Sequence, residues 1–203
     1  MSTRTTRVVL AFSTALLVGA LFAVAALAVD NTSFRMVRSE SAIAQGEDCL
    51  DDAFANVRIV SVGDNQTMDV TLRNMPANTG FTLFVLQRPN APFGVSWYQG
   101  DIETDATGTG SVRVKGIFSE EVFAIAPGSV GAPQVDDQDA QTNPAFAPVH
   151  TFHLGVWFAK PAQAAAAGCS DTVTPFDGDH RAGTQALSTR QIRNNWGPLR
   201  RIG

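Results

Sequence analysis

Apolar and polar residues alternate in the middle of this chain, and this feature constrains the fold more than any other. Met68, Val70 and Leu72 are separated by polar residues, which predicts a strand with one buried face and one face toward water. Residues 81–86 and 152–158 are apolar at most positions, as in strands that are buried on both faces. Residues that favour turns lie between these segments. The pattern therefore predicts a β-rich fold.

Two further strands are predicted on either side of the turn at residues 105–110, namely residues 101–104 and 111–115, and we expect them to form a hairpin. Several short strands with turns between them predict an all-β domain, specifically an immunoglobulin-like antiparallel β-sandwich. One short helix is predicted over residues 161–167, since proline suits its first turn and Gly168 can end it.

The N-terminal residues 1–29 have the pattern of an export signal. Arg4 and Arg7 precede an uncharged segment, residues 8–29, that is rich in leucine, valine and alanine. Small residues around Ala28 favour cleavage there, but the segment is also long enough to remain as a membrane anchor. Both alternatives place the rest of the chain outside the cytoplasm, secreted or in the cell envelope. Contact with a membrane is expected only through residues 8–29, and only if they are not removed.

The rest of the chain is predicted to consist of a linker and one domain. Residues 30–47 are polar and without periodicity, which predicts a linker, and residues 48–203 are assigned to the β-sandwich domain. The domain ends in a basic tail, which contains Arg190, Arg193, Arg200 and Arg201. The net charge of the whole chain is −4. This acidic balance argues against nucleic acid as a partner, because binding nucleic acid requires clustered cations.

The sequence has two cysteines, Cys49 and Cys169. An even number of cysteines in an exported protein favours a disulfide. The bridge would connect the beginning of the domain to its last third, so we expect the residues between to fold as one cooperative unit. Two separate reactive thiols are the alternative, but no Cys-x-x-Cys spacing supports it.

Several segments resemble known extracellular proteins. The strand-turn-strand unit at residues 72–84 and the turn at 104–108 are similar to those of many bacterial extracellular β-sandwich domains. Residues 148–157 and 174–180 resemble a group of uncharacterised secreted proteins from actinobacterium-like genomes. The resemblance covers most of residues 50–200. It implies a fold and a compartment, and it implies no activity.

Histidines and aspartates provide candidate metal ligands. His150 and His153 lie in one predicted strand, and His180 follows Asp177 and Asp179. Zinc or copper requires three or four converging nitrogen, oxygen or sulfur ligands. A spacing of three places His150 and His153 on opposite faces of a regular strand, so these two converge only at a strand end or a bulge. No cofactor is expected, and a divalent metal at these residues is the alternative.

Other chemistry has weaker support in the sequence. Asp136, Asp137 and Asp139 could provide oxygen ligands for calcium, although their spacing is not that of an EF-hand loop. A Gly-x-Ser-x-Gly nucleophile motif is absent. Asp101 and Glu103 share a strand face, as the two catalytic carboxylates of a glycosidase could. Their predicted exposure to solvent, however, gives no reason for a raised pKa. No catalytic residue is therefore assigned.

Aromatic residues provide the remaining candidate site. Phe93, Trp97 and Tyr98 are predicted ligand contacts, because exposed aromatic rings stack on sugar rings or peptide side chains. Since neighbouring strand residues point to opposite faces, we expect one ring of the Trp97-Tyr98 pair in the core and the other outside. Trp157 is expected to be buried. The sequence predicts a non-catalytic binding module for a cell-wall glycan or a surface protein. The alternatives are a metal-binding protein or metal-dependent enzyme that uses the three histidines, and a purely structural envelope protein.

Overall fold

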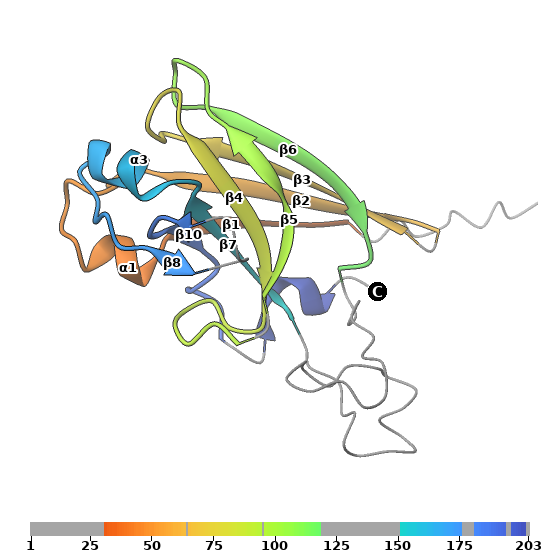
Figure 1. The fold of residues 1–203 in the computed structure, drawn as a ribbon. Coiled ribbons are helices and arrows are strands. Elements are labelled where there is room, and N and C mark those ends of the chain that lie inside the picture. Colours follow the sequence, from red (N-terminus) through yellow and green to blue (C-terminus); the bar gives the residue numbers. More distant parts are fainter. Residues whose placement is uncertain are drawn as a thin grey trace, which may run out of the picture.

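The computed structural model describes residues 31–63, 65–94, 96–118, 151–175, 181–193 and 196–201 (Figure 1). The export signal predicted over residues 1–29 lies outside them. The strands are β1 (Asn31–Arg38), β2 (Phe54–Val62), β3 (Asn65–Arg73), β4 (Gly80–Leu86), β5 (Ser96–Glu103), β6 (Gly110–Gly116), β7 (His153–Phe158), β8 (Thr174–Pro175), β9 (Arg181–Ala182) and β10 (Gln185–Ser188). The helices are α1 (Glu40–Ile43), α3 (Pro161–Ala166) and the 3₁₀ turn η3 (Pro198–Arg201). None of the described helices is long and apolar enough to cross a membrane.

Eight strands form one antiparallel sheet, in the order β5-β4-β7-β10-β1-β2-β3-β6. The sheet is strongly curved (Figure 1). Its two edge strands approach each other, since a Cβ built on Gly100 of β5 would lie 3.3 Å from Cγ2 of Val112 in β6. Strands β8 and β9 pair separately. The all-β prediction is therefore confirmed, with eight of the described strands joined in one curved sheet.

The buried side chains form two clusters, one on each face of the sheet. The main core contains Met68, Val70 and Leu72, all fully buried, as the alternation in β3 predicts. Full burial of such a side chain stabilises the fold by roughly 1.5–3 kcal/mol. A smaller cluster lies on the outer face of β4 and β7, where Trp157 is fully buried as predicted. Both β4 and β7 are thus buried on both faces, which explains their continuous apolar sequence.

The prediction of a linker over residues 30–47 is wrong, because residues 31–38 form strand β1 and residues 40–43 form helix α1. Strand β1 lies between β10 and β2 in the sheet. Only Phe34 and Met36 of β1 pack in the main core, and the residue between them, Arg35, is charged. Two apolar positions are too few to reveal a strand whose pairing depends on residues far along the chain. The described domain begins with β1 and not at residue 48.

Strands β5 and β6 have the positions predicted for a hairpin, but they do not pair as one. Strand β5 pairs with β4, and β6 pairs with β3. The loop at residues 104–109 therefore crosses between the two edges of the sheet. It packs against the loop at 74–79, which crosses from β3 to β4. Thr104 joins the two loops: its hydroxyl donates to the carbonyl of Pro76 at 2.6 Å and accepts the backbone N–H of Thr79 at 2.9 Å.

Replacing Thr104 with valine is expected to destabilise the protein by about 1–3 kcal/mol, because the isosteric change leaves the buried N–H of Thr79 and the partly buried carbonyl of Pro76 without their partner. The measurement is the urea midpoint followed by circular dichroism. The control is Thr71→Val, on the outer face of β3, which should change stability by less than about 0.5 kcal/mol. Equal effects of the two substitutions would contradict this role for the Thr104 hydroxyl.

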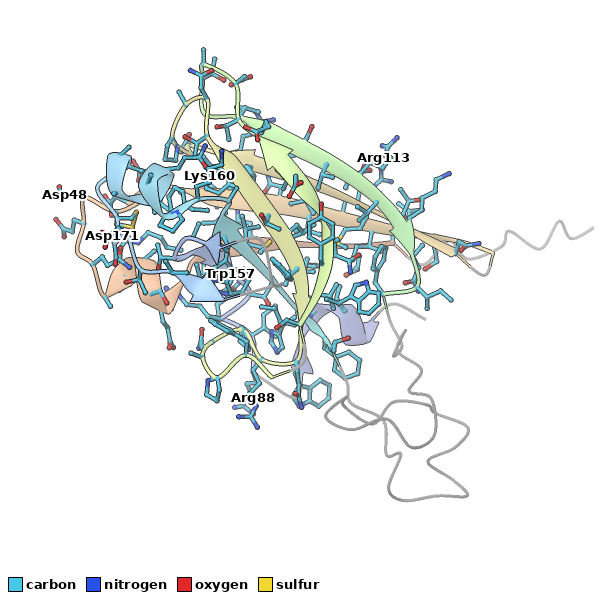
Figure 2. The ribbon with its side chains drawn as sticks, in the orientation of Figure 1. Asp48, Arg88, Arg113, Trp157, Lys160 and Asp171 are labelled. Carbon is cyan, nitrogen blue, oxygen red and sulfur yellow. A yellow bond between two sulfur atoms is a disulfide. The ribbon has the colours of Figure 1, made fainter. Side chains whose placement is uncertain are left out.

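The predicted disulfide and short helix are both confirmed. Cys49 and Cys169 are bonded, with their Cα atoms 4.8 Å apart. Helix α3 ends near Gly168, whose φ of +75° is the left-handed conformation that glycine adopts readily. The bridge joins the end of this helix to the segment before β2. It lies at the same end of the molecule as α1 and α3, close to the labelled Asp48 and Asp171 (Figure 2).

The described part of the basic tail packs against the sheet. Leu199 is fully buried, and its backbone N–H donates to the carbonyl of Phe152 at 3.1 Å. The guanidinium of Arg190 donates to the carbonyl of Arg38 at the end of β1, at 2.6 Å. Trp196 remains half-exposed. The tail thus covers part of the domain through Leu199 and Arg190.

Candidate functional site

The candidate site is a hollow of about 170 Å³ between the edge strands β5 and β6. Near the loop at residues 104–109 the two strands lie against each other, whereas the hollow lies toward their other ends. Its lining residues come from four segments and are Val85, Trp97, Gln99, Lys115, Gly116, Ile117, Phe118 and Thr151. The site exists because the two edges of the sheet approach without pairing.

The pairing of β5 with β4 determines where its aromatic rings lie. Trp97 is opposite Val85, which packs in the main core, whereas Tyr98 is opposite Phe84 of the outer cluster. Directly opposed residues in an antiparallel pair have side chains on the same face. Trp97 is therefore on the core-facing side of β5 and Tyr98 on the outer side. The register shifts after Tyr98, so that Gln99 is an extra residue in β5, as in a β-bulge.

The two rings lie on opposite faces as expected, but the prediction that one of them is buried is wrong. Trp97 is 42% exposed and Tyr98 is 48% exposed. The core-facing side of β5 meets the hollow at Trp97, because the sheet does not close there. On the other face, the Tyr98 ring meets the edge of the Phe84 ring at a centroid distance of 6.0 Å.

The remaining walls of the hollow combine apolar and polar groups. Phe118 is buried and Ile117 is exposed, and both follow directly after β6. The backbone N–H of Phe118 donates to the side-chain oxygen of Gln66 at 2.5 Å, which holds this segment against β3. The amide of Gln99 and the ammonium of Lys115 contribute hydrogen-bond donors. Such a mixture suits a ligand with an apolar face and hydroxyl groups.

Phe93, the third predicted aromatic contact, lies in a different environment. Its ring makes a T-shaped contact with the Trp157 ring at a centroid distance of 5.0 Å, and it is partly buried in the outer cluster. The loop that carries Phe93 is attached to the domain by a hydrogen bond from the Gln185 side chain to the carbonyl of Pro89, at 3.1 Å. Phe93 thus covers Trp157, whereas Trp97 lines the hollow.

Of the predicted metal ligands, the structure describes His153 alone. It is fully buried on the outer face of β7, and its Nδ1 lies 2.9 Å from the hydroxyl oxygen of Thr189. The other four lie outside the described residues: His150, Asp177, Asp179 and His180. Within the described part of the chain, no three histidine, cysteine, aspartate or glutamate side chains are grouped to hold a metal ion. The metal site therefore stays a prediction, and so does calcium binding at residues 136–139.

Sequence reasoning found Trp97 but missed the rest of the hollow. Ile117 and Phe118 form a short apolar pair after a glycine, a signal too common to indicate a site. Gln99 and Lys115 are ordinary polar strand residues until the sheet curves and brings β5 next to β6. A scan against protein-family models finds no match, and neither does a comparison with curated proteins.

Proposed function

We propose that the protein is a non-catalytic binding module, secreted or held in the cell envelope, and that it binds a cell-wall glycan at the Trp97 hollow. The observation that carries this proposal is the 42% exposure of Trp97 in a hollow with an apolar wall. An aromatic face offers a broad apolar surface, which suits the apolar face of a sugar ring. Gln99 and Lys115 at the same hollow would orient the sugar by hydrogen bonds to its hydroxyl groups.

The compartment and the fold family are parts of the same proposal. A disulfide between Cys49 and Cys169 supports an oxidising environment, since such bridges persist mainly outside the cytoplasm. The positive and apolar pattern of residues 1–29 supports export. We assign the curved antiparallel sheet to the immunoglobulin-like sandwiches, a class in which binding residues often lie on edge strands and loops.

Replacing Trp97 with alanine is expected to weaken binding to purified cell-wall glycan at least about tenfold, because a stacked aromatic anchor typically contributes about 2 kcal/mol or more. The assay is sedimentation of the protein with insoluble glycan over a range of glycan concentrations. The matched control is Trp196→Ala, which removes an exposed tryptophan from the tail. Thermal unfolding of both variants shows whether the fold is retained.

The outcomes separate a glycan ligand from a protein partner. Unchanged glycan binding by a folded Trp97→Ala variant would exclude the hollow as the glycan site. A different outcome is that the unmutated protein binds no glycan but forms a crosslink to a surface protein. If the Trp97→Ala substitution abolishes that crosslink, the partner is a protein. Equal losses in the two tryptophan variants would show that the effect is not specific to the hollow.

A further inference from the structure

The outer face of strands β1, β2, β3 and β6 carries a regular array of polar side chains. In β3 the residues between the buried Met68, Val70 and Leu72 point outward. The strand register then aligns the outward residues in rows across the four strands. One row contains Arg113, Asp69, Arg58 and Ser33, and the next contains Ser111, Thr71, Asn56 and Arg35. A third row contains Lys115, Thr67, Val60 and Asn31.

This polar face is basic although the chain as a whole has a net charge of −4. In the three rows, four cationic side chains accompany a single carboxylate, that of Asp69. Arg113 neutralises that carboxylate through two hydrogen bonds, of 2.5 and 3.0 Å, and its guanidinium holds the pKa of Asp69 below the usual range. In these rows no further carboxylate balances the positive charges of Arg35, Arg58 and Lys115.

A hollow of about 580 Å³ lies between Arg35 and Arg58. Its lining residues come from β1, β2 and β3 and are Ser33, Phe34, Arg35, Asn56, Val57, Arg58, Asp69 and Thr71. Arg35 is opposite Asn56, and Arg58 is opposite Ser33, so the two arginines are diagonal neighbours with Cα atoms roughly 7–8 Å apart. Neutral hydrogen-bonding side chains therefore lie directly beside each guanidinium.

The two arginines are held differently. The Arg35 guanidinium lies over the ring of Phe54, 4.0 Å from its centroid, which fixes it at one side of the hollow. The Arg58 guanidinium lies in the same row as Asp69 and attracts its carboxylate, but in the part of the chain that the structure describes it makes no hydrogen bond and no salt bridge within 4 Å. Arg58 thus presents its donors to a ligand, and Arg35 provides a second, positioned cation.

We propose that this face binds an acidic polysaccharide, with uronic-acid carboxylates on Arg35 and Arg58 and sugar hydroxyls on Ser33, Asn56 and Thr71. A uronic acid carries a carboxylate and hydroxyls on one ring, which matches the alternation of guanidinium and neutral polar groups in the hollow. A protein partner usually requires large apolar anchors at the centre of its interface, and here the Phe54 ring is covered by Arg35. The inference rests on Arg35 and Arg58 and not on Lys115, which this face shares with the Trp97 hollow.

The test measures binding of the exported protein to polygalacturonate, with neutral dextran as the comparison polymer, by titration calorimetry at low salt. We expect binding to polygalacturonate alone. Arg58→Gln should weaken this binding at least about tenfold. The double variant that also carries Arg35→Gln should bind more weakly still. Raising the salt concentration should weaken binding by the parent more steeply than by the variants.

The matched control is Arg88→Gln, which removes the same charge from an exposed arginine in the loop after β4, away from Arg113 and the polar face (Figure 2). It should bind polygalacturonate like the parent. The proposal is overturned by any of three results: no binding to the acidic polymer, equal binding to dextran, or equal losses in Arg88→Gln and Arg58→Gln. Sedimentation that shows self-association abolished by Arg58→Gln would instead make a second copy of this chain the occupant.

Discussion

Replacing Gly155 with alanine is expected to destabilise the protein by about 3 kcal/mol, at the upper end of the usual cost of overpacking a core. Gly155 lies in the middle of β7, between Phe84 of β4 and Ser188 of β10. A Cβ at this position would lie 2.4 Å from Cζ3 of Trp157 and 2.7 Å from Cδ1 of Leu86. Both neighbours are fully buried, so neither can move away without disturbing the outer cluster.

The indole of Trp157 has little freedom to give way. The rings of Phe84 and Phe93 form T-shaped contacts with it, at centroid distances of 5.4 and 5.0 Å. The glycine is thus required for space, since its φ is not in the left-handed region. The measurement is the urea midpoint for Gly155→Ala, with Gly100→Ala in edge strand β5 as the control.

Gly100→Ala should change stability by less than about 1 kcal/mol, because its new Cβ would approach Val112 at 3.3 Å and alanine suits a strand better than glycine does. A double variant that also replaces Trp157 with phenylalanine tests the cause. Because the smaller ring leaves room for the alanine, the double variant should be more stable than the sum of the two single effects predicts. A strictly additive result would contradict the steric explanation.

The sequence predicted those parts of the fold that have a local signal. Strand β3 alternates with period two, β4 and β7 are continuously apolar, and helix α3 begins with proline and ends near Gly168. In each case the residues of the segment itself determine how much of it is buried. The disulfide was predictable from the cysteine count, because two cysteines in a chain with the pattern of an export signal favour a bridge between them.

The remaining parts depend on contacts between distant residues. Strand β1 has two core residues, and its place in the sheet depends on β2 and β10, so its own sequence resembles a linker. Strands β5 and β6 are adjacent in the chain, which favoured a hairpin. Their separation depends on how Thr104 and the loop at residues 74–79 join the two edges. No single segment carries that information.

The candidate site was predictable only in part for the same reason. Trp97 and Tyr98 were predicted as contacts because exposed aromatic rings stack on sugar rings or peptide side chains. The exposure of Trp97 follows from the incomplete closure of the sheet at β5, whereas Tyr98 is exposed on the outer face. The basic face was missed because the average charge of the chain is negative and because Arg35, Arg58 and Arg113 are far apart in sequence. Only the strand register brings them together.

Removal of the disulfide by replacing Cys49 and Cys169 with alanine is expected to lower the free energy of unfolding by about 2–5 kcal/mol. The two cysteines are 120 residues apart in the sequence, so the bridge closes a long loop and strongly restricts the unfolded chain. The bridge also connects the segment before β2 to the end of α3, which are otherwise joined by the side chain of Gln45 and the backbone N–H of Ser170. Urea unfolding of the parent and of the double variant measures the difference.

Reductant provides an internal control for this prediction. It should lower the urea midpoint of the parent toward that of the double alanine variant, whereas the variant itself should not respond. If the bridge acts mainly on the unfolded state, the reduced parent should keep the circular dichroism spectrum of the folded protein without urea. Loss of that spectrum would instead show that the bridge holds the folded domain together. The carboxylates of Glu47, Asp48 and Asp52 lie beside Cys49 in the sequence, and their mutual repulsion opposes closure of this end, whereas Asp51 is paired with Arg38 at 3.0 Å.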